Sequence, residues 1–191
     1  METTVVVAED ELITRMDLAE ILKGAGYKVV GMAKDGLDAI EICRREKPNL
    51  AIMDVKMPVM DGLEAIKIIQ KEKTAGCIVL LTAFSDNEYI EKARDLGVMT
   101  YLAKPFDEST LIPAIKVALA KQREMDKIQD ELEVISKKLD DRKFVERAKG
   151  ILMKKHHFSE DQAYKTPRKL AMDKRMSISE ISRLLIDSIK D

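Results

Sequence analysis

Four apolar segments in the first half of the chain each lead into side chains that could take part in phosphoryl chemistry. The segments are Val5–Ala8, Leu50–Met53, Ile78–Leu81 and Met99–Leu102, and they lead into Glu9 with Asp10, Asp54, Thr82 and Lys104. Buried parallel strands are continuous apolar runs, and ligands of open α/β sheets gather at the carboxyl ends of the strands. Asp54 alone could equally be a turn or cap residue. Together, however, carboxylates for Mg²⁺, an ammonium and a hydroxyl would supply the charge neutralisation on which phosphoryl transfer depends.

The elements that must position these groups alternate regularly along the first 120 residues. Strands are predicted at Val5–Ala8, Lys28–Met32, Leu50–Met53, Ile78–Leu81 and Met99–Leu102, and helices near 11–24, 36–46, 62–72 and 87–95. Ser85–Glu88 has the pattern of a capping box and marks the start of the last of these helices. This alternation predicts an α/β domain with a doubly wound, five-stranded parallel sheet that helices cover on both faces.

About residues 3–120 therefore resemble the receiver domain of two-component response regulators, because the acidic pair, Asp54, Thr82 and Lys104-Pro105 follow the family's order and approximate spacing. The resemblance implies a flavodoxin-like fold and a sensor histidine kinase as partner. It assigns Asp54 as the phosphoacceptor. The Mg²⁺ ligands that it implies are Glu9, Asp10, Asp54 and the backbone carbonyl of Lys56. Thr82 and Lys104 would contact the phosphoryl oxygens, and Tyr101 would be the aromatic switch that rotates inward when Thr82 moves. It also implies a cis bond before Pro105. Many receivers have Asp in place of Glu9, whose longer side chain should still reach the metal.

A long helix is predicted to begin near Asp107, with no Pro or Gly from Ala114 to Lys149. Alternating steps of four and three join Ala114, Ala118, Lys121, Met125, Ile128, Leu132, Ile135 and Leu139. Such spacing is typical of a coiled coil, and the second half of this seam is the more apolar. The helix could pair with a second copy of the chain or fold back on its own C-terminal domain. We favour the homodimer.

The last 50 residues are basic and helical. Residues 142–191 hold 13 Lys and Arg against 7 Asp and Glu, a formal charge of +6. Capping boxes at Ser159–Gln162 and Ser177–Glu180 mark two helix starts. The charge suggests nucleic-acid binding, although Lys and Arg that merely solvate helical faces would give the same excess.

The segments Ala148–Met153, Ser159–Tyr164, Arg168–Met172 and Ser177–Ile186 resemble an ANTAR domain over about residues 130–191. The resemblance implies a coiled coil leading into a three-helix bundle that binds RNA hairpins in leader transcripts and prevents transcription termination. The candidate RNA contacts are Ala148, Lys149, Gly150, Lys154, Lys155, Arg168, Lys169, Lys174 and Arg175. Tyr164 is assigned to packing. Ala148 and Gly150 would leave a patch without side chains, where RNA or another helix could approach.

One feature departs from the ANTAR pattern, which usually has Leu before the Arg of this segment. Here the residues are Thr166-Pro167-Arg168. Proline inside a helix costs about 3 kcal/mol and removes a hydrogen bond, whereas Thr-Pro is a suitable pair for beginning a helix. We therefore predict a kink or break near Thr166, with a short helix on either side. His156 and His157 are predicted at an exposed helix end.

Composition limits the remaining possibilities. We predict a receiver at residues 1–120, a coiled-coil linker at 121–141 and an ANTAR-like bundle at 142–191. No apolar run suits a membrane span, and Cys43 and Cys77 are expected to be reduced thiols, so the protein is predicted to be cytoplasmic. The predicted function is phosphorylation-controlled antitermination without an external substrate. The alternatives are a DNA-binding response regulator and a protein-interaction output module.

Overall fold

The computed structural model describes residues 2–83 and 96–188 and divides into two compact units, Met1–Asp126 and Lys127–Asp191. The division falls inside the segment 121–141 that is predicted as a linker. The predicted helix near 87–95 and the capping box at Ser85–Glu88 lie outside the described residues. No helix in the described ranges is long and apolar enough to cross a membrane.

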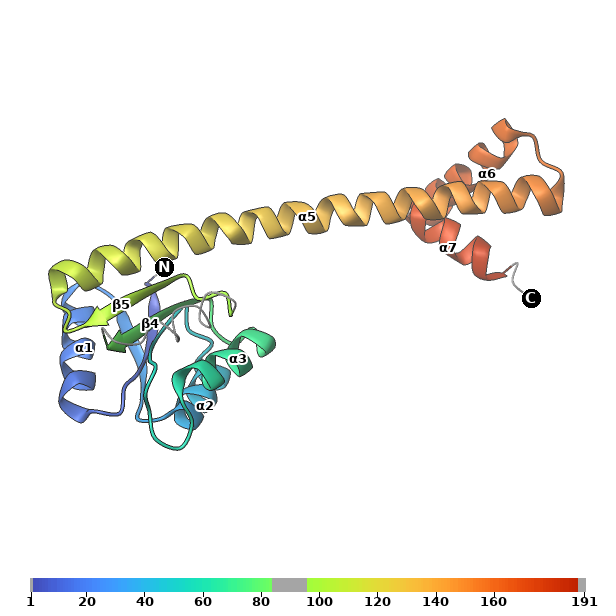
Figure 1. Cartoon of the computed structure of the whole chain (residues 1–191). Coiled ribbons are helices and arrows are strands. Elements are labelled where there is room, and N and C mark those ends of the chain that lie inside the picture. Colours follow the sequence, from blue (N-terminus) through green and yellow to red (C-terminus); the bar gives the residue numbers. More distant parts are fainter. Residues whose placement is uncertain (1, 84–95, 189–191) are drawn as a thin grey trace. The chain divides into compact units, whose positions relative to one another are not determined.

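The N-terminal unit is built on a five-stranded parallel sheet, as the sequence predicts (Figure 1). Its strands are β1 Thr4–Ala8, β2 Lys28–Ala33, β3 Leu50–Asp54, β4 Cys77–Ala83 and β5 Thr100–Lys104. Their order is β2-β1-β3-β4-β5, and every neighbouring pair is parallel. The strands that lead into Glu9, Thr82 and Lys104 therefore point in the same direction as β3, which ends at Asp54.

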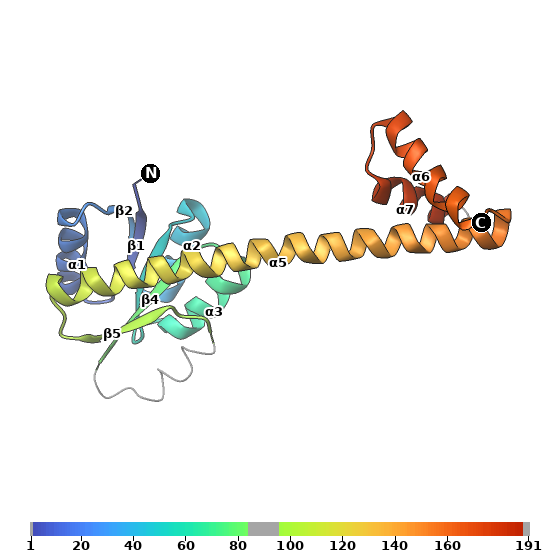
Figure 2. The ribbon, with the colours of Figure 1, turned by 90° about the horizontal axis from the view of Figure 1, so that it is seen from above.

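Helices cover both faces of this sheet. They are α1 Leu12–Gly24, α2 Gly36–Glu46, α3 Gly62–Glu72 and the beginning of α5 Glu108–His156. One hydrophobic cluster joins Val6 to α2 and α3, and the other joins Val5 and Val7 to Leu18 of α1 and Ile115 of α5. Alternate residues of β1 thus face opposite helical layers. The two layers of helices can be followed in Figures 1 and 2.

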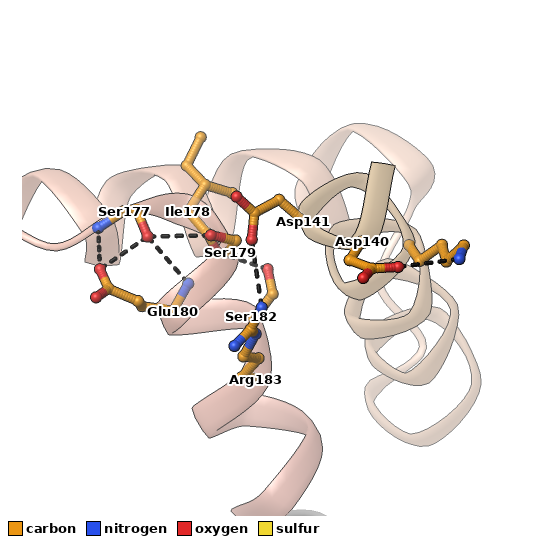
Figure 3. Close-up of polar contacts among 9 residues, drawn as sticks. Asp140, Asp141, Ser177, Ile178, Ser179, Glu180, Ser182 and Arg183 are labelled. Atoms are coloured by element: carbon orange, nitrogen blue, oxygen red, sulfur yellow. Dashed lines mark hydrogen bonds and ion pairs between the residues drawn. The ribbon is translucent and has the colours of Figure 1, made fainter. Parts of the chain in front are cut away.

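The C-terminal unit joins the later part of α5 to α6 Glu160–Lys174 and α7 Ile178–Ser188. Both predicted capping boxes are confirmed. The Ser159 hydroxyl accepts from the Gln162 amide at 3.3 Å, and the Ser159 amide donates to the Gln162 side chain at 2.9 Å. The corresponding contacts join Ser177 and Glu180 at 3.2 and 2.8 Å (Figure 3). These reciprocal bonds satisfy backbone donors that would otherwise be unpaired in the first turn.

Charged side chains join α5 to both of the shorter helices. Lys149 Nζ lies 2.7 Å from a carboxylate oxygen of Glu160, at the start of α6. Arg183 of α7 lies 3.4 Å from a carboxylate oxygen of Asp141, and its guanidinium stands 4.3 Å from the centroid of the Phe144 ring. Figure 3 shows Arg183 reaching from α7 to Asp141. A cation over an aromatic face adds attraction to the ion pair and helps to fix α7 against α5.

The predicted break near Thr166 is wrong, because α6 runs continuously from Glu160 to Lys174 with Pro167 inside it. The ring of Pro167 is buried between the buried residues Ala163 and Ala171. The hydroxyl of Thr166 donates to the carbonyl of Gln162 at 2.8 Å, which satisfies a backbone acceptor next to the missing bond. Apolar burial of the ring offsets the lost hydrogen bond.

The second half of the predicted coiled-coil seam on α5 is exposed in the single chain, whereas Ala118 in the first half is 1% exposed and packs in the receiver core. Met125, Ile128, Leu132, Ile135 and Leu139 each leave 50–56% of their surface accessible. A helix folded back on its own bundle would cover these side chains, so the described structure does not support that alternative. His156 ends α5 and His157 follows it with φ of 56°, and both are exposed as predicted.

Candidate functional site

Three carboxylates meet at the carboxyl edge of the sheet. β1 and β3 are adjacent parallel strands with Ala8 opposite Met53, so the residues that follow, Glu9 and Asp54, lie side by side. One carboxylate oxygen from each of Glu9, Asp10 and Asp54 lies within 4.8 Å of the others. Glu9 and Asp54 are 1% and 5% exposed, whereas Asp10 is open to solvent. The cluster is therefore half enclosed and can be approached from one side.

Lys104 is the counter-ion of the two buried carboxylates. Its Nζ lies 2.8 Å from Asp54 Oδ2 and 2.6 Å from Glu9 Oε2. Burial raises the pKa of Glu9 and of Asp54, and the hydrogen bonds from Lys104 oppose that rise. Burial acts to lower the Lys104 pKa, but the hydrogen bonds to Asp54 and Glu9 raise it overall. Lys104 thus stays charged and partly neutralises a site that would otherwise repel a phosphoryl group.

The same geometry fits a divalent cation. Carboxylate oxygens are the ligands that Mg²⁺ prefers, and three of them converge here. Glu9 Oε2 is buried, and the positive group beside it is the Lys104 ammonium at 2.6 Å. Lys56, whose carbonyl is the fourth predicted ligand, is an exposed residue two positions beyond Asp54, between the buried residues Val55 and Met57. Glu9, Asp10 and Asp54 could therefore hold Mg²⁺, and Glu9 can stand where many receivers have Asp.

The remaining predicted residues lie on β4 and β5. Thr82 is 1% exposed near the end of β4, and its neighbour Ala83 is opposite Lys104. Tyr101 is on β5 with 51% of its surface exposed, so its ring stands outward. The bond between Lys104 and Pro105 is cis, as the resemblance implies.

Arg15 belongs to this site and was not predicted. Its guanidinium, on α1, donates to the backbone carbonyls of Glu9 and, at 3.2 Å, of Asp10. The N-cap residue of α1, Glu11, makes no side-chain capping bond, so Arg15 helps to hold the turn that carries the acidic pair. Beside it, a groove of about 470 Å³ is lined by Glu11, Thr14, Asp17, Ile21, Lys104, Pro105 and Phe106.

Gly62 allows α3 to begin against the backbone of Asp54. A Cβ atom at position 62 would lie 2.0 Å from the Asp54 carbonyl oxygen. The Gly62 amide also donates to the Val55 carbonyl at 2.8 Å. The residue after the Asp61 cap must therefore be small for Asp54 to keep its position.

Gly62→Ala is expected to lower the free energy of unfolding by about 1–3 kcal/mol, because the added methyl group meets backbone that must shift. Gly24→Ala is the control, since a Cβ there meets nothing within 4 Å. That change should raise stability by about 0.5–1 kcal/mol, because alanine favours the helix. Urea unfolding followed by circular dichroism measures both. Equal stability of the two variants would contradict the steric argument.

The candidate RNA contacts separate into different environments. Lys154, Lys155, Arg168, Lys169, Lys174 and Arg175 are exposed. Ala148 is 1% exposed and belongs to the core of the bundle, whereas a Cβ on Gly150 would meet nothing within 4 Å. Ala148 and Gly150 thus do not form the predicted patch without side chains. Lys149 pairs with Glu160 and, at 3.7 Å, with Glu146, and the hydrogen bond to Glu160 raises the pKa of Lys149.

The arrangement at Asp54 has counterparts in known proteins. The family model for the response regulator receiver domain matches residues 5–116. The chain belongs to the response regulators. Its receiver is followed by a match to the ANTAR domain at residues 133–186. This combination is a regulatory rather than an enzymatic architecture, in which the receiver implies control by phosphorylation and the ANTAR family implies RNA binding.

Relatives support both assignments. The transcriptional regulatory protein PdtaR of Mycobacterium tuberculosis (strain ATCC 25618 / H37Rv) is 45% identical over 185 residues, which cover 97% of this response regulator and 90% of PdtaR. Sporulation initiation phosphotransferase F of Bacillus subtilis (strain 168) is 31% identical over 116 residues, 61% of this chain and 93% of that protein. The first similarity extends through the ANTAR domain, and the second is confined to the length of a receiver.

Solved structures agree with the flavodoxin-like fold of the receiver. Chemotaxis protein CheY4 of Vibrio cholerae superposes with a TM-score of 0.58 at 28% identity, covering 62% of this chain and 99% of that one. A CheY-like receiver domain protein of Methanospirillum hungatei JF-1 gives a TM-score of 0.61 at 24% identity, over 65% of this chain and 99% of that one. The second likeness concerns the fold alone.

Proposed function

We propose that this response regulator is phosphorylated on Asp54 and, in that state, binds hairpins of nascent leader RNA and prevents transcription termination. The observation that carries the proposal is the buried Asp54 carboxylate, beside Lys104 and two further carboxylates, in a chain that also contains an ANTAR domain. The phosphoryl group would leave the histidine nitrogen of a sensor kinase as an oxygen of Asp54 bonds to phosphorus. Because such a transfer needs positioning and charge neutralisation, the surroundings of Asp54 suit it.

The residues around Asp54 take separate roles in this proposal. Glu9, Asp10, Asp54 and the carbonyl of Lys56 would hold Mg²⁺, which neutralises charge on the phosphoryl oxygens. Lys104 would exchange its contact with the carboxylate for one with a phosphoryl oxygen. The hydroxyl of Thr82 would donate to another of these oxygens, and the ring of Tyr101 would turn inward as Thr82 moves. Asp54, Thr82 and Lys104 lie at or next to the carboxyl ends of β3, β4 and β5, whereas Tyr101 lies earlier on β5.

The kinase would approach over α1. Leu12, Ile13 and Met16 expose 57–69% of their surfaces on this helix, and the adjoining groove reaches Lys104. Exposed apolar groups beside a reactive residue suit a protein partner that covers the site while the phosphoryl group is transferred.

In the proposed function, phosphorylation leads to a homodimer that brings two ANTAR bundles onto one RNA. The exposed seam from Met125 to Leu139 has the spacing of a coiled coil. Linking two modest RNA contacts raises the overall affinity through effective concentration. A dimer would therefore bind an RNA with two hairpins more tightly than it binds either hairpin alone.

The test is binding of the purified chain to a tandem-hairpin leader RNA and to duplex DNA of equal length, with Mg²⁺ and with or without a small phosphodonor. We expect binding to favour RNA and to strengthen with the phosphodonor. Equal competition by duplex DNA would favour a DNA-binding regulator. Absence of nucleic-acid binding in both states would favour a protein partner and contradict the RNA proposal.

A further inference from the structure

The exposed seam on α5 is self-complementary when two copies of the helix run in opposite directions. In the C-terminal unit the seam consists of Ile128, Leu132, Ile135 and Leu139, each with more than half of its surface accessible. Ile128 lies as far before the midpoint between positions 133 and 134 as Leu139 lies after it, and Leu132 and Ile135 are placed in the same way. A two-fold axis through this midpoint therefore sets every isoleucine opposite a leucine.

The bundle of the same chain packs on the other side of α5. Arg183 of α7 contacts Asp141 and Phe144 (Figure 3), and Ala148 is buried in the core of the bundle. Because an α-helix turns by about 100° per residue, these three residues of α5 lie roughly opposite Leu139. The seam is therefore accessible to a second copy while the bundle keeps its own contacts.

The order of leucine and isoleucine along the seam does not suit two parallel helices. A seam residue followed by the next one three positions later occupies heptad position a, and the later residue occupies position d. Leu132 and Leu139 are thus at position a, and Ile128 and Ile135 are at position d. Parallel pairs prefer the reverse order, and Leu at a with Ile at d shifts parallel helices toward larger assemblies. An antiparallel pair avoids this mismatch, because each of its layers joins one leucine to one isoleucine.

Charged residues beside the seam also distinguish the two directions. Glu131 and Lys138 directly precede Leu132 and Leu139, so they lie on the same flank of the seam. Both are exposed, and neither makes an ion pair with any residue in 2–83 or 96–188. In an antiparallel pair this flank lies beside the equivalent flank of the second copy, which brings Glu131 of each chain to Lys138 of the other. The antiparallel pair thus gains two ion pairs related by the two-fold axis.

A parallel pair would instead bring like charges together. Lys138 would face Lys143 of the other copy, five residues further along the helix. Asp140 lies 3.0 Å from Lys143 in the same chain, but an ion pair so exposed to water offsets the charge only in part. Arg142, at the next position d, would meet the equivalent arginine of the second copy. Charge therefore opposes a parallel assembly of any size.

We propose that two copies of the chain pair through the α5 seam in the antiparallel direction, an inference that rests on the homodimer of the proposed function. The two bundles then lie at opposite ends of the coil. With a rise of about 1.5 Å per residue, the two Ala148 residues would be about 45 Å apart along the coil axis. In a parallel pair they would lie side by side. An RNA that binds both bundles of the antiparallel dimer therefore needs two elements separated by a comparable distance.

Distances between spin labels test the direction of the coil in the full chain, with Mg²⁺ and a phosphodonor. Burial raises the pKa of Cys43 and of Cys77 to about 12, so a thiol-directed label reacts at an introduced exposed cysteine instead. Labels at Arg147→Cys, an exposed position near one end of the coil, should lie about 40 Å apart or more. A parallel pair would hold them within about 25 Å, because packed helices are about 8–10 Å apart. Lys137→Cys, close to the two-fold axis, is the control and should give a short distance in either direction.

Reversal of one flanking charge gives a second test, whose sign depends on the direction. Lys138→Glu is expected to weaken the antiparallel dimer by about tenfold, because two ion pairs become two repulsive pairs of glutamates. In a parallel dimer the new glutamate would face Lys143 and strengthen the association. Adding Glu131→Lys to Lys138→Glu should restore the wild-type dissociation constant within about twofold, because it re-forms both ion pairs with their charges exchanged.

The control for the charge reversal is Lys127→Glu, which makes the same change at an exposed position of α5 outside this flank. It should alter the dissociation constant by less than about twofold. Sedimentation velocity over a range of protein concentrations measures the constant for each variant and the number of chains in the assembly.

The outcomes separate the direction of the coil from the dimer itself. A phosphorylated wild-type chain that stays monomeric overturns both this inference and the homodimer of the proposed function. Dimers that hold the Arg147→Cys labels within about 25 Å overturn the antiparallel direction while the homodimer stands. Dimers that Lys138→Glu strengthens or leaves unchanged do the same. An assembly of four chains also overturns it, because that is the parallel arrangement that Leu at a and Ile at d would favour.

Discussion

Asp54→Asn is expected to abolish incorporation of a phosphoryl group from a small phosphodonor. The amide lacks the anionic oxygen that bonds to phosphorus, and the change also removes one of the three converging carboxylates. Lys104 would keep its 2.6 Å ion pair with Glu9, so the sheet edge should remain folded. Mass spectrometry of the intact chain, with Mg²⁺ present, measures the added phosphoryl group directly.

The control for this change is Asp17→Asn, which alters an exposed aspartate of α1 outside the carboxylate cluster. That variant should be phosphorylated like the wild type, because a small donor does not depend on a kinase-docking surface. RNA binding by Asp54→Asn should equal that of the untreated wild type and should not respond to the donor. A fully phosphorylated Asp54→Asn chain would show that another carboxylate, such as Asp10, is the acceptor.

Removal of Mg²⁺ tests the assignment of the carboxylate cluster around Asp54 as a metal site. Chelation of Mg²⁺ is expected to suppress phosphorylation of the wild-type chain. Without the metal, Lys104 alone would have to neutralise the negative charge of the incoming phosphoryl group and of the carboxylates. Titration of Mg²⁺ back into the reaction, followed by the same mass measurement, gives the concentration that restores half of the phosphorylation. A rate independent of chelator would contradict the assignment of Glu9, Asp10 and Asp54 as ligands.

The sheet and its reactive edge could be predicted because their signals are local in the sequence. Each strand is a short apolar run, and parallel strands bring their carboxyl ends to the same edge. The positions of Glu9, Asp54 and Lys104 follow from that topology without any knowledge of side-chain contacts. Arg15 could not be found in the same way, because it donates to backbone carbonyls, and no residue type in the acidic turn indicates such a bond.

The errors in the C-terminal unit have a different cause. Spacing along a helix shows which residues share a side, but it does not show which side faces the bundle. For Ala148 and Gly150 the spacing of two residues already places them in different directions, and the structure buries Ala148 while a Cβ on Gly150 would meet nothing within 4 Å. The predictions for Pro167 and Tyr164 failed because the sequence does not show which side of α6 faces the bundle. Pro167 is buried in the bundle, and this burial is absent from the cost of proline in an isolated helix. Tyr164 lies outside the core.

The exposed seam on α5 gives the second large expected effect. Leu132→Asn should weaken homodimerisation of the phosphorylated chain by about 100-fold or more. A two-fold dimer loses the burial of two leucines, each contributing about 1.5–3 kcal/mol. The isolated chain should lose little stability, because Leu132 is already 55% exposed. Sedimentation velocity over a range of protein concentrations, with and without a phosphodonor, measures the dissociation constant.

Val134→Asn is the matched control for the seam, because it changes an apolar side chain of similar exposure, 52%, on the same helix but outside the three-and-four spacing. This variant should dimerise like the wild type. The Leu132 variant should also lose the advantage that a tandem-hairpin RNA has over a single hairpin, since that advantage requires two linked bundles. Equal dimerisation of both variants would place the interface on another surface. Retention of the tandem advantage by a monomeric Leu132 variant would show that RNA, rather than the coil, brings the two bundles together.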